Sequence, residues 1–118
     1  MANYSIPVDR LFHALGDPTR LAIVERLARG PATVSELASP AAMALPSFLK
    51  HLKVLDDAGL VRSEKAGRVR TCRLERAALS AAERWVEVQR EAWNHRLDAL
   101  EGFIAAQAGD PKDDDRHD

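Results

Sequence analysis

The sequence predicts a mainly α-helical fold with one small β-hairpin, arranged as a winged helix-turn-helix with additional helices at both ends. Three observations support this prediction. Apolar residues recur at helical spacing in several segments before residue 60. Between residues 61 and 74, two segments with the alternation of β-strands flank a glycine. A long segment with helical spacing of its apolar residues follows. A chain of 118 residues suits one domain with a modest core. We therefore expect one domain over residues 1–107.

Two helices are expected within residues 8–29. Gly16 suits the end of the first helix, and Asp17 suits the N-cap of the second because its carboxylate can accept bonds from free N–H groups in the first turn. Pro18 is tolerated in that turn. The apolar stripe of the first helix consists of Val8, Leu11, Phe12 and Leu15. The residues of the second helix expected to face the core are Leu21, Val24, Leu27 and Ala28.

A helix-turn-helix is expected within residues 33–58. Thr33 and Glu36 match a capping box, T-x-x-E, which would begin a third helix. Pro46 lies in the first turn of a fourth helix, over residues 46–58. The residues of this helix spaced to face the core are Phe48, Leu52 and Leu55. The residues on or near its opposite face include Pro46, Ser47, Lys50, His51 and Lys53.

The second half of the chain should contain a β-hairpin and a long helix. The segments LVRSEK and RVRTCRL predict the hairpin, over residues 61–74, with Ala66 and Gly67 between them. Alternation would place Arg68, Arg70, Cys72 and Leu74 on one face of the hairpin. Ser80 and Glu83 match a second capping box, which would begin a helix of roughly 25 residues.

Charge is unevenly distributed, although the formal net charge is only −1. Between Leu45 and Arg76, eight Lys and Arg residues outnumber four Asp and Glu residues, whereas residues 110–118 contain five Asp against two Lys or Arg. This asymmetry is typical of a basic binding surface and a solvated acidic tail. Because the tail has few apolar residues, we expect residues 108–118 to be disordered.

The basic segment suits double-stranded DNA. A helix with leucines on one face and lysines on the other can lie in the major groove while it packs on its own core. The arginines of the hairpin, the wing, can reach phosphates or the neighbouring minor groove. A winged helix that binds only proteins is the alternative, but it would not need eight basic residues clustered on the fourth helix and the wing.

Composition argues against several other classes of protein. No apolar run approaches the ~18–20 residues that span a bilayer, and the N-terminal MANYSIPVDR lacks the apolar segment of a signal peptide. One cysteine, Cys72, excludes an internal disulfide framework and suits a reducing compartment, so we expect a cytoplasmic protein. Without a Ser-His-acid set, paired catalytic carboxylates or a phosphate-binding glycine loop, we expect neither an enzyme nor a cofactor.

Three stretches resemble the ArsR family of dimeric bacterial transcriptional repressors. They read LFHALGDPTRLAIVERLARGPATVSELA, LPSFLKHLKVLDDAGLV and GRVRTCRL, and they follow one another over residues 11–74. The resemblance implies that each recognition helix, residues 46–58, enters one half of a palindromic operator. It also implies a DNA-binding set of Pro46, Ser47, Lys50, His51, Lys53, Arg68 and Arg70.

The same resemblance implies that the N- and C-terminal helices form the dimer interface. The C-terminal helix carries an apolar stripe too extensive for one small domain to cover, and a lone long helix needs a packing partner. The residues expected at the interface are Leu11, Phe12, Trp85, Trp93, Leu97 and Leu100.

The founding members of the resembled family sense metals or metalloids. One family site uses cysteines in the first helix of the helix-turn-helix, where this chain reads VSELASPA. A second site lies on the C-terminal helix. His95 and Asp98 match its second half, but residues 82–84, which include Arg84, do not supply the first. We therefore expect no metal site. A metal-responsive repressor that uses His95 and Asp98 remains the alternative.

Cys72 could serve as a redox-active thiol or as a packing residue. Arg70 and Arg73 could lower the pKa of the Cys72 thiol and make it redox-active, but the chain has no second cysteine to pair with it. A small packing residue in the hairpin is the favoured interpretation. The sequence identifies neither a small-molecule effector nor the operator.

Overall fold

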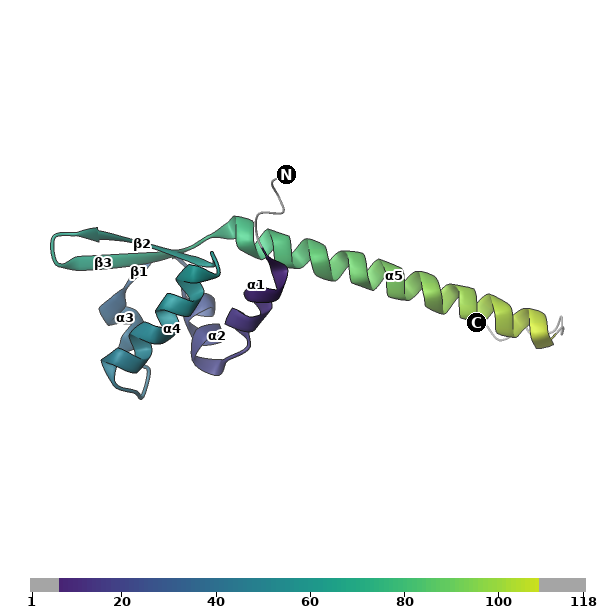
Figure 1. The fold of residues 1–118 in the computed structure, drawn as a ribbon, viewed down its shortest axis with the longest axis horizontal. Helices are drawn as coiled ribbons and strands as arrows, with labels where there is room; N and C mark the ends of the chain where they lie inside the picture. The colour runs from purple at the N-terminus through teal and green to yellow at the C-terminus, as the bar shows by residue number, and fades with distance from the viewer. Residues whose placement is uncertain (1–6, 109–118) are drawn as a thin grey trace. The chain divides into compact units, whose positions relative to one another are not determined.

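The structure is a computed structural model that describes residues 7–108 (Figure 1). Over this range it is mainly helical, with a small antiparallel sheet, as the sequence predicts. No helix in this range is long and apolar enough to cross a membrane. In chain order the elements are α1 (Val8–Leu15), α2 (Pro18–Leu27), β1 (Ala32–Thr33), α3 (Val34–Ala38), α4 (Leu45–Asp57), β2 (Val61–Ala66), β3 (Val69–Leu74) and α5 (Arg76–Ala108).

The chain divides into two compact units between Glu83 and Arg84, within α5. We call residues 7–83 the body and residues 84–108 the C-terminal segment. Every core residue of the described chain lies in the body, at or before Ala82. The largest fully buried side chains are Phe48, Leu11, Leu55, Leu60, Val61 and Cys72.

Two side-chain caps fix where helices of the body begin. The Asp17 carboxylate accepts bonds from the backbone N–H groups of Thr19, at 2.9 Å, and Arg20, at 3.1 Å. Thr33 N–H donates to Glu36 Oε1 at 2.8 Å, and Glu36 N–H donates to Thr33 Oγ1 at 3.1 Å. Both predicted caps are therefore confirmed. These bonds stabilise the ionised carboxyl groups, so the pKa values of Asp17 and Glu36 lie below their ordinary values.

The face that α4 packs on the core is also as predicted, since Phe48, Leu52 and Leu55 are buried. The prediction for α2 was partly wrong. Its buried residues are Ile23, Val24 and Leu27, whereas Leu21 and Ala28 are exposed. The stretch LAIV is apolar on every side, so its spacing could not distinguish the two faces, and Ala28 lies past the end of the helix.

The sheet has three antiparallel strands in the order β1-β3-β2. Strand β1 pairs Ala32 with Cys72 and Thr33 with Thr71, and the hairpin of β2 and β3 lies beside α3 and α4 (Figure 1). The sequence predicts only the hairpin, because a strand of two residues leaves no alternation to detect. Thr33 therefore ends β1 and also caps α3.

The tip of the wing is a two-residue turn of Gly67 and Arg68, because Ala66 pairs with Val69. Gly67 has a φ of +66°, and within residues 7–108 no residue other than glycine has a positive φ. This pattern fits a type II′ turn, whose first central position favours glycine. The predicted turn was one residue too early, so Arg68 belongs to the turn and not to the face that carries Arg70.

Helix α5 begins at Arg76, four residues before the predicted capping box. Ser80 is inside the helix, and the box prediction was wrong. The chain leaves β3 with a bond from Glu75 N–H to Leu60 O at 2.8 Å and enters α5 directly, since Ala77, Ala78 and Leu79 are strong helix formers. The predicted acidic tail lies outside the described residues, apart from Ala108, which ends α5.

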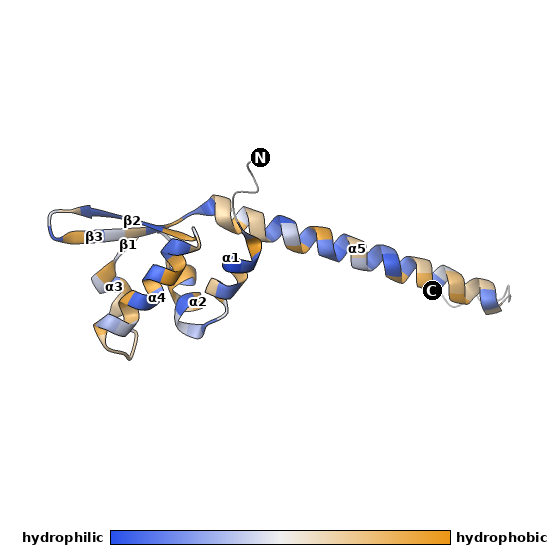
Figure 2. Ribbon diagram, in the orientation of Figure 1, coloured by the Kyte–Doolittle hydropathy of each residue, from blue (hydrophilic) through white to orange (hydrophobic). Residues whose placement is uncertain are grey.

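All residues of the C-terminal segment are exposed, including its large apolar ones. Hydrophobic and hydrophilic residues follow one another along α5 (Figure 2). The most exposed apolar side chains of the segment are Val88, Trp93, Leu100, Phe103 and Ile104, each more than half accessible.

Candidate nucleic-acid interface

Helix α4 presents one polar face to solvent, opposite the residues that anchor it to the core. Pro46, Ser47, Lys50 and Lys53 are all exposed on it. Ala44 occupies the N-cap position, and no side chain caps the helix. The N–H groups of its first turn therefore lack a side-chain acceptor, and no side chain offsets the positive end of the helix dipole there.

The two lysines of α4 differ in their surroundings. Lys53 Nζ lies 3.2 Å and 3.3 Å from the two carboxylate oxygens of Asp57, one helical turn away. Lys50 makes no ion pair or hydrogen bond with any residue in the range 7–108. Lys50 thus carries the less compensated charge on this face.

The arginines of the wing also divide into two groups. Arg73 pairs with Glu64 at 3.2 Å, and Arg62 lies 3.9 Å from Glu75, so these charges are offset. Arg70 donates to the neutral Ser63 Oγ at 3.0 Å and keeps its charge uncompensated, as does Arg68 at the tip, for which no acidic partner occurs in the described part of the chain.

A surface hollow of about 400 Å³ brings the wing and α4 together. Leu45 and Leu49 of α4 line it, as do Lys65, Arg68 and Arg70 of the wing. Residues that are about 20 positions apart in the sequence therefore surround one concave surface, which is basic on the side of the wing.

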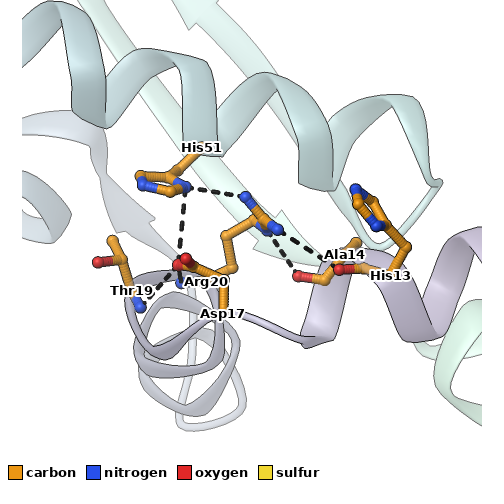
Figure 3. Close-up of polar contacts among 6 residues, drawn as sticks. All are labelled: His13, Ala14, Asp17, Thr19, Arg20 and His51. Carbon is orange, nitrogen blue, oxygen red and sulfur yellow. Dashed lines mark hydrogen bonds and ion pairs between the residues drawn. The ribbon is translucent and has the colours of Figure 1, made fainter.

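His51 lies at the edge of this face and points towards α2 (Figure 3). Its Nδ1 is 3.0 Å from an Arg20 guanidinium nitrogen and 3.7 Å from Asp17 Oδ2. The His51 side chain is only partly exposed, at 23%, whereas its neighbours Lys50 and Ser47 are exposed. The sequence gives no sign of this contact, because Arg20 and His51 are 31 residues apart.

Cys72 is a packing residue, as favoured above. Its side chain is 1% exposed. Burial raises the pKa of the thiol; the nearby charge of Arg70 lowers it less, and Asp56 raises it further. The suggestion that neighbouring arginines lower this pKa below its ordinary value was therefore wrong, because desolvation of the thiolate outweighs their charge.

No three His, Cys, Asp or Glu side chains come close enough to hold a metal ion within residues 7–108 of a single chain. His95 and Asp98 are both exposed on α5.

The structure corrects one residue of the expected dimer interface. Leu11 is fully buried in the body of its own chain, so it has no surface left to contact a partner. Phe12, Trp85, Trp93, Leu97 and Leu100 are each between 38% and 58% exposed. Val88 and Phe103 are equally accessible, although neither was predicted at the interface. Phe103 follows Leu100 at helical spacing, so the same stripe could have included it.

Known proteins share both the sequence and the fold. A Helix-turn-helix domain family matches residues 15–64. The HTH-type transcriptional regulator Rv2034 of Mycobacterium tuberculosis is 47% identical over 81 residues, which cover 69% of this chain and 75% of that protein. The crystal structure of an ArsR family transcriptional regulator is 53% identical, with a TM-score of 0.73, over 80% of this chain and 97% of the other.

A solution structure from Mycobacterium bovis is also similar. It is described as the homodimeric winged helix-turn-helix DNA-binding domain of a possible ArsR-family transcriptional regulator. That chain is 31% identical, with a TM-score of 0.56, and the match covers 75% of this chain and 80% of the other.

Proposed function

This chain belongs to the ArsR family of winged helix-turn-helix transcriptional regulators, and we propose that it is a homodimeric, cytoplasmic repressor that binds a palindromic DNA operator. Residues 1–107 would form its DNA-binding and dimerisation domain. No catalytic role is proposed, and no cofactor is needed for this function.

The observation that carries the proposal is the two-sided character of α4. Its Phe48, Leu52 and Leu55 hold it to the core, while its opposite face exposes Ser47 and Lys50. A helix held in this way can enter the major groove without losing its packing. In a symmetric dimer, two such helices would reach half-sites about one helical turn (~10 bp) apart.

The wing would contact the DNA backbone or the adjacent minor groove. Arg68 is at the tip of a rigid two-residue turn, and Arg70 shares a hollow with the N-terminal part of α4. Guanidinium groups at such positions suit phosphate oxygens, to which they can donate two bonds at once.

Dimerisation would use the C-terminal segment together with Phe12. The segment exposes a run of large apolar side chains that cost free energy in water, and covering them on a second copy would remove that cost. The homodimeric state described for the Mycobacterium bovis domain supports dimerisation of this chain.

We further propose that the repressor works without a metal. A metal-responsive repressor that uses His95 and Asp98 is the competing hypothesis within the family. A winged helix that binds only proteins is the competitor from another class, and the uncompensated charges of Lys50, Arg68 and Arg70 argue against it.

The test is a fluorescence-anisotropy titration of DNA from the protein's own promoter, at several salt concentrations, with and without Zn(II). We expect tight, salt-sensitive binding that Zn(II) does not change. Release of DNA by Zn(II) would support the metal-responsive alternative. Affinity no higher than for random DNA would support the protein-binding alternative.

Lys50→Ala tests the recognition helix in the same assay. If Lys50 contacts one phosphate in each protomer, the slope of log affinity against log salt should fall by about 2, or about 0.9 for each phosphate. Lys53→Ala is the matched control, and a smaller change is expected because Asp57 already offsets that charge. Unchanged binding by Lys50→Ala would remove α4 from the proposed interface.

A further inference from the structure

His51 belongs to a polar cluster that joins α4 to the end of α1 and the start of α2 (Figure 3). The other members are Asp17 and Arg20, and the cluster also uses the backbone carbonyl groups of His13 and Ala14. In this cluster a side chain of α4, His51, is held by side chains at the start of α2.

Arg20 is fixed from two directions. Its Nε donates to Ala14 O at 2.8 Å, and one of its terminal nitrogens, Nη2, donates to His13 O at 3.4 Å. These carbonyl groups lie at the C-terminal end of α1, where the helix dipole favours a cation, and His13 O also accepts from the Gly16 N–H at 3.1 Å. The guanidinium is therefore oriented before it meets His51.

The contact with Arg20 determines which nitrogen of His51 carries the proton. The other terminal nitrogen of Arg20, Nη1, lies 3.0 Å from His51 Nδ1. A guanidinium can only donate hydrogen bonds, so Nδ1 must accept and cannot itself be protonated. A neutral imidazole carries one proton, which must then be on Nε2.

Asp17 does not compete for Nδ1. Its Oδ2 is 3.7 Å from that nitrogen, which is too far for a hydrogen bond, and the same oxygen already accepts from the N–H groups of Thr19 and Arg20. Asp17 instead begins α2 at the place where Arg20 can reach both α1 and His51.

His51 Nε2 is open to solvent. Every buried side-chain nitrogen or oxygen in the described part of the chain has a hydrogen-bond partner, and Nε2 has none within that range. It is therefore not buried. It follows Lys50 directly and lies one helical turn after Ser47, beside the exposed face of α4.

We propose that His51 Nε2–H donates a hydrogen bond to a DNA phosphate oxygen, and that Arg20 and Asp17 are positioning residues that hold the neutral imidazole in this tautomer. The inference rests on the proposed DNA-binding function and adds an uncharged donor to it. A neutral donor neutralises no phosphate and releases no counterion, so its loss should lower affinity without changing the salt dependence.

The tautomer is tested first, by long-range ¹H–¹⁵N NMR on the 118-residue chain at a pH well above neutral. The His51 signals are identified by their absence in His51→Asn. We expect Nδ1 to appear as an unprotonated nitrogen and Nε2 as a protonated one. A proton on Nδ1, in either the neutral or the charged ring, would overturn the proposal.

The DNA contact is tested by the operator affinity of His51→Asn. An asparagine side-chain oxygen lies near the position of Nδ1 and can still accept from Arg20, but no group replaces Nε2–H. We expect binding at least about tenfold weaker, because a hydrogen bond to a charged oxygen is worth more than a neutral one. The salt slope and the melting temperature should stay unchanged.

His13→Asn is the matched control, because His13 contributes only its backbone carbonyl to the cluster and its side chain is exposed. It should bind the operator like the wild type. Arg20→Lys should also weaken binding, because an ammonium cannot donate to three acceptors in the planar arrangement of a guanidinium. Its NMR spectrum should show a His51 ring no longer held in one state.

The outcomes separate this inference from the proposed function. If the wild type binds the operator and His51→Asn binds equally tightly, the Nε2 contact is wrong and the repressor proposal stands. If His51→Asn flattens the salt slope as Lys50→Ala is expected to do, the ring acts as a cation and the neutral donor is wrong. If the wild type shows no specific binding to DNA, both proposals fail together.

Discussion

The body buries many of its apolar residues, whereas the C-terminal segment exposes all of them. In the body, the large side chains of helices and sheet meet in one core, and what remains outside on α4 and the wing is mainly charged. In the C-terminal segment no side chain is buried, and tryptophan, leucine and phenylalanine side chains are more than two-fifths accessible.

The difference shows that the two regions depend on different partners. The body packs its largest buried side chains in a core of its own, and the exposed basic residues of α4 and the wing suit a polyanion. An isolated helix gains little stability from its backbone alone and depends on packing. The C-terminal segment therefore needs a second apolar surface, which a second copy of the chain can supply.

Trp93→Asp should have the largest effect and should break the dimer while leaving the body folded. It removes a large apolar contact and places a charge at the proposed interface, so self-association should weaken about 1,000-fold. Sedimentation velocity measures the oligomeric state, and circular dichroism checks the fold. Asn94→Asp adds the same charge at the next position, away from the apolar stripe, and should remain dimeric. A Trp93→Asp dimer would place the interface elsewhere.

Leu55→Ala should instead act on the body. Leu55 has no exposed surface, so its truncation leaves a cavity and should lower the free energy of unfolding by about 3 kcal/mol in urea titrations. Leu49→Ala makes the same change on the same helix at a side chain that is 43% exposed. Its effect should be much smaller. If the two variants lowered the free energy of unfolding equally, the difference in burial between Leu55 and Leu49 would be contradicted.

Acid should weaken the body through its two helix caps. The pKa of Asp17 is lowered first by the Arg20 backbone N–H, and that of Glu36 by the Thr33 backbone N–H. Each pKa is lower in the folded chain than in the unfolded one, so the carboxylates add stability above the unfolded pKa values. This stability is lost as the pH falls through the folded values.

Asp17→Asn and Glu36→Gln isolate this effect, because each amide can still accept the capping bond. Melting temperatures of the variants should lie below that of the wild type at neutral pH and converge with it in acid. Glu25→Gln is the control, since Glu25 accepts no backbone bond from another described residue through its side chain. A constant difference at every pH would rule out the charge of the caps as the cause.

Asp57→Asn should have the smallest effect, and it should strengthen operator binding, whereas the other variants weaken dimerisation or stability. Removing the carboxylate beside Lys53 frees a second charge on α4, so operator binding should become about two- to fivefold tighter and more salt-dependent. Asp56→Asn makes the same charge change next to it but leaves the Lys53 pair intact. If both variants gain equally in anisotropy titrations, the gain comes from net charge and not from Lys53.

Much of the fold could be predicted because several local signals agreed. The bounds of α1 follow from its apolar stripe and the Gly16–Asp17 pair after it, and the core face of α4 follows from three well-spaced residues. The errors came where a signal was absent or duplicated. Strand β1 is too short to show a pattern, and Ser80 offered a cap inside a helix that had already begun.

The candidate site was less accessible from sequence. Which residues of α4 face solvent could be predicted from their spacing, but their partners could not. Lys53 is offset by Asp57 while Lys50 is not, and His51 is bound by Arg20, a residue from a different helix. The burial of Leu11 and Cys72 likewise depends on how distant elements meet in the core.

The pairing of β1 has a consequence for how the wing could be rebuilt. Because β1 contacts β3 only at Thr71 and Cys72, the part of the hairpin from Lys65 to Arg70 extends beyond the third strand. All six of its residues are exposed. Two residues inserted into each strand there would lengthen the hairpin, keep the side chains beyond the insertion on their present faces and leave the core untouched. The reach of the wing along DNA can therefore be changed as a separate design variable, without redesign of the helix-turn-helix.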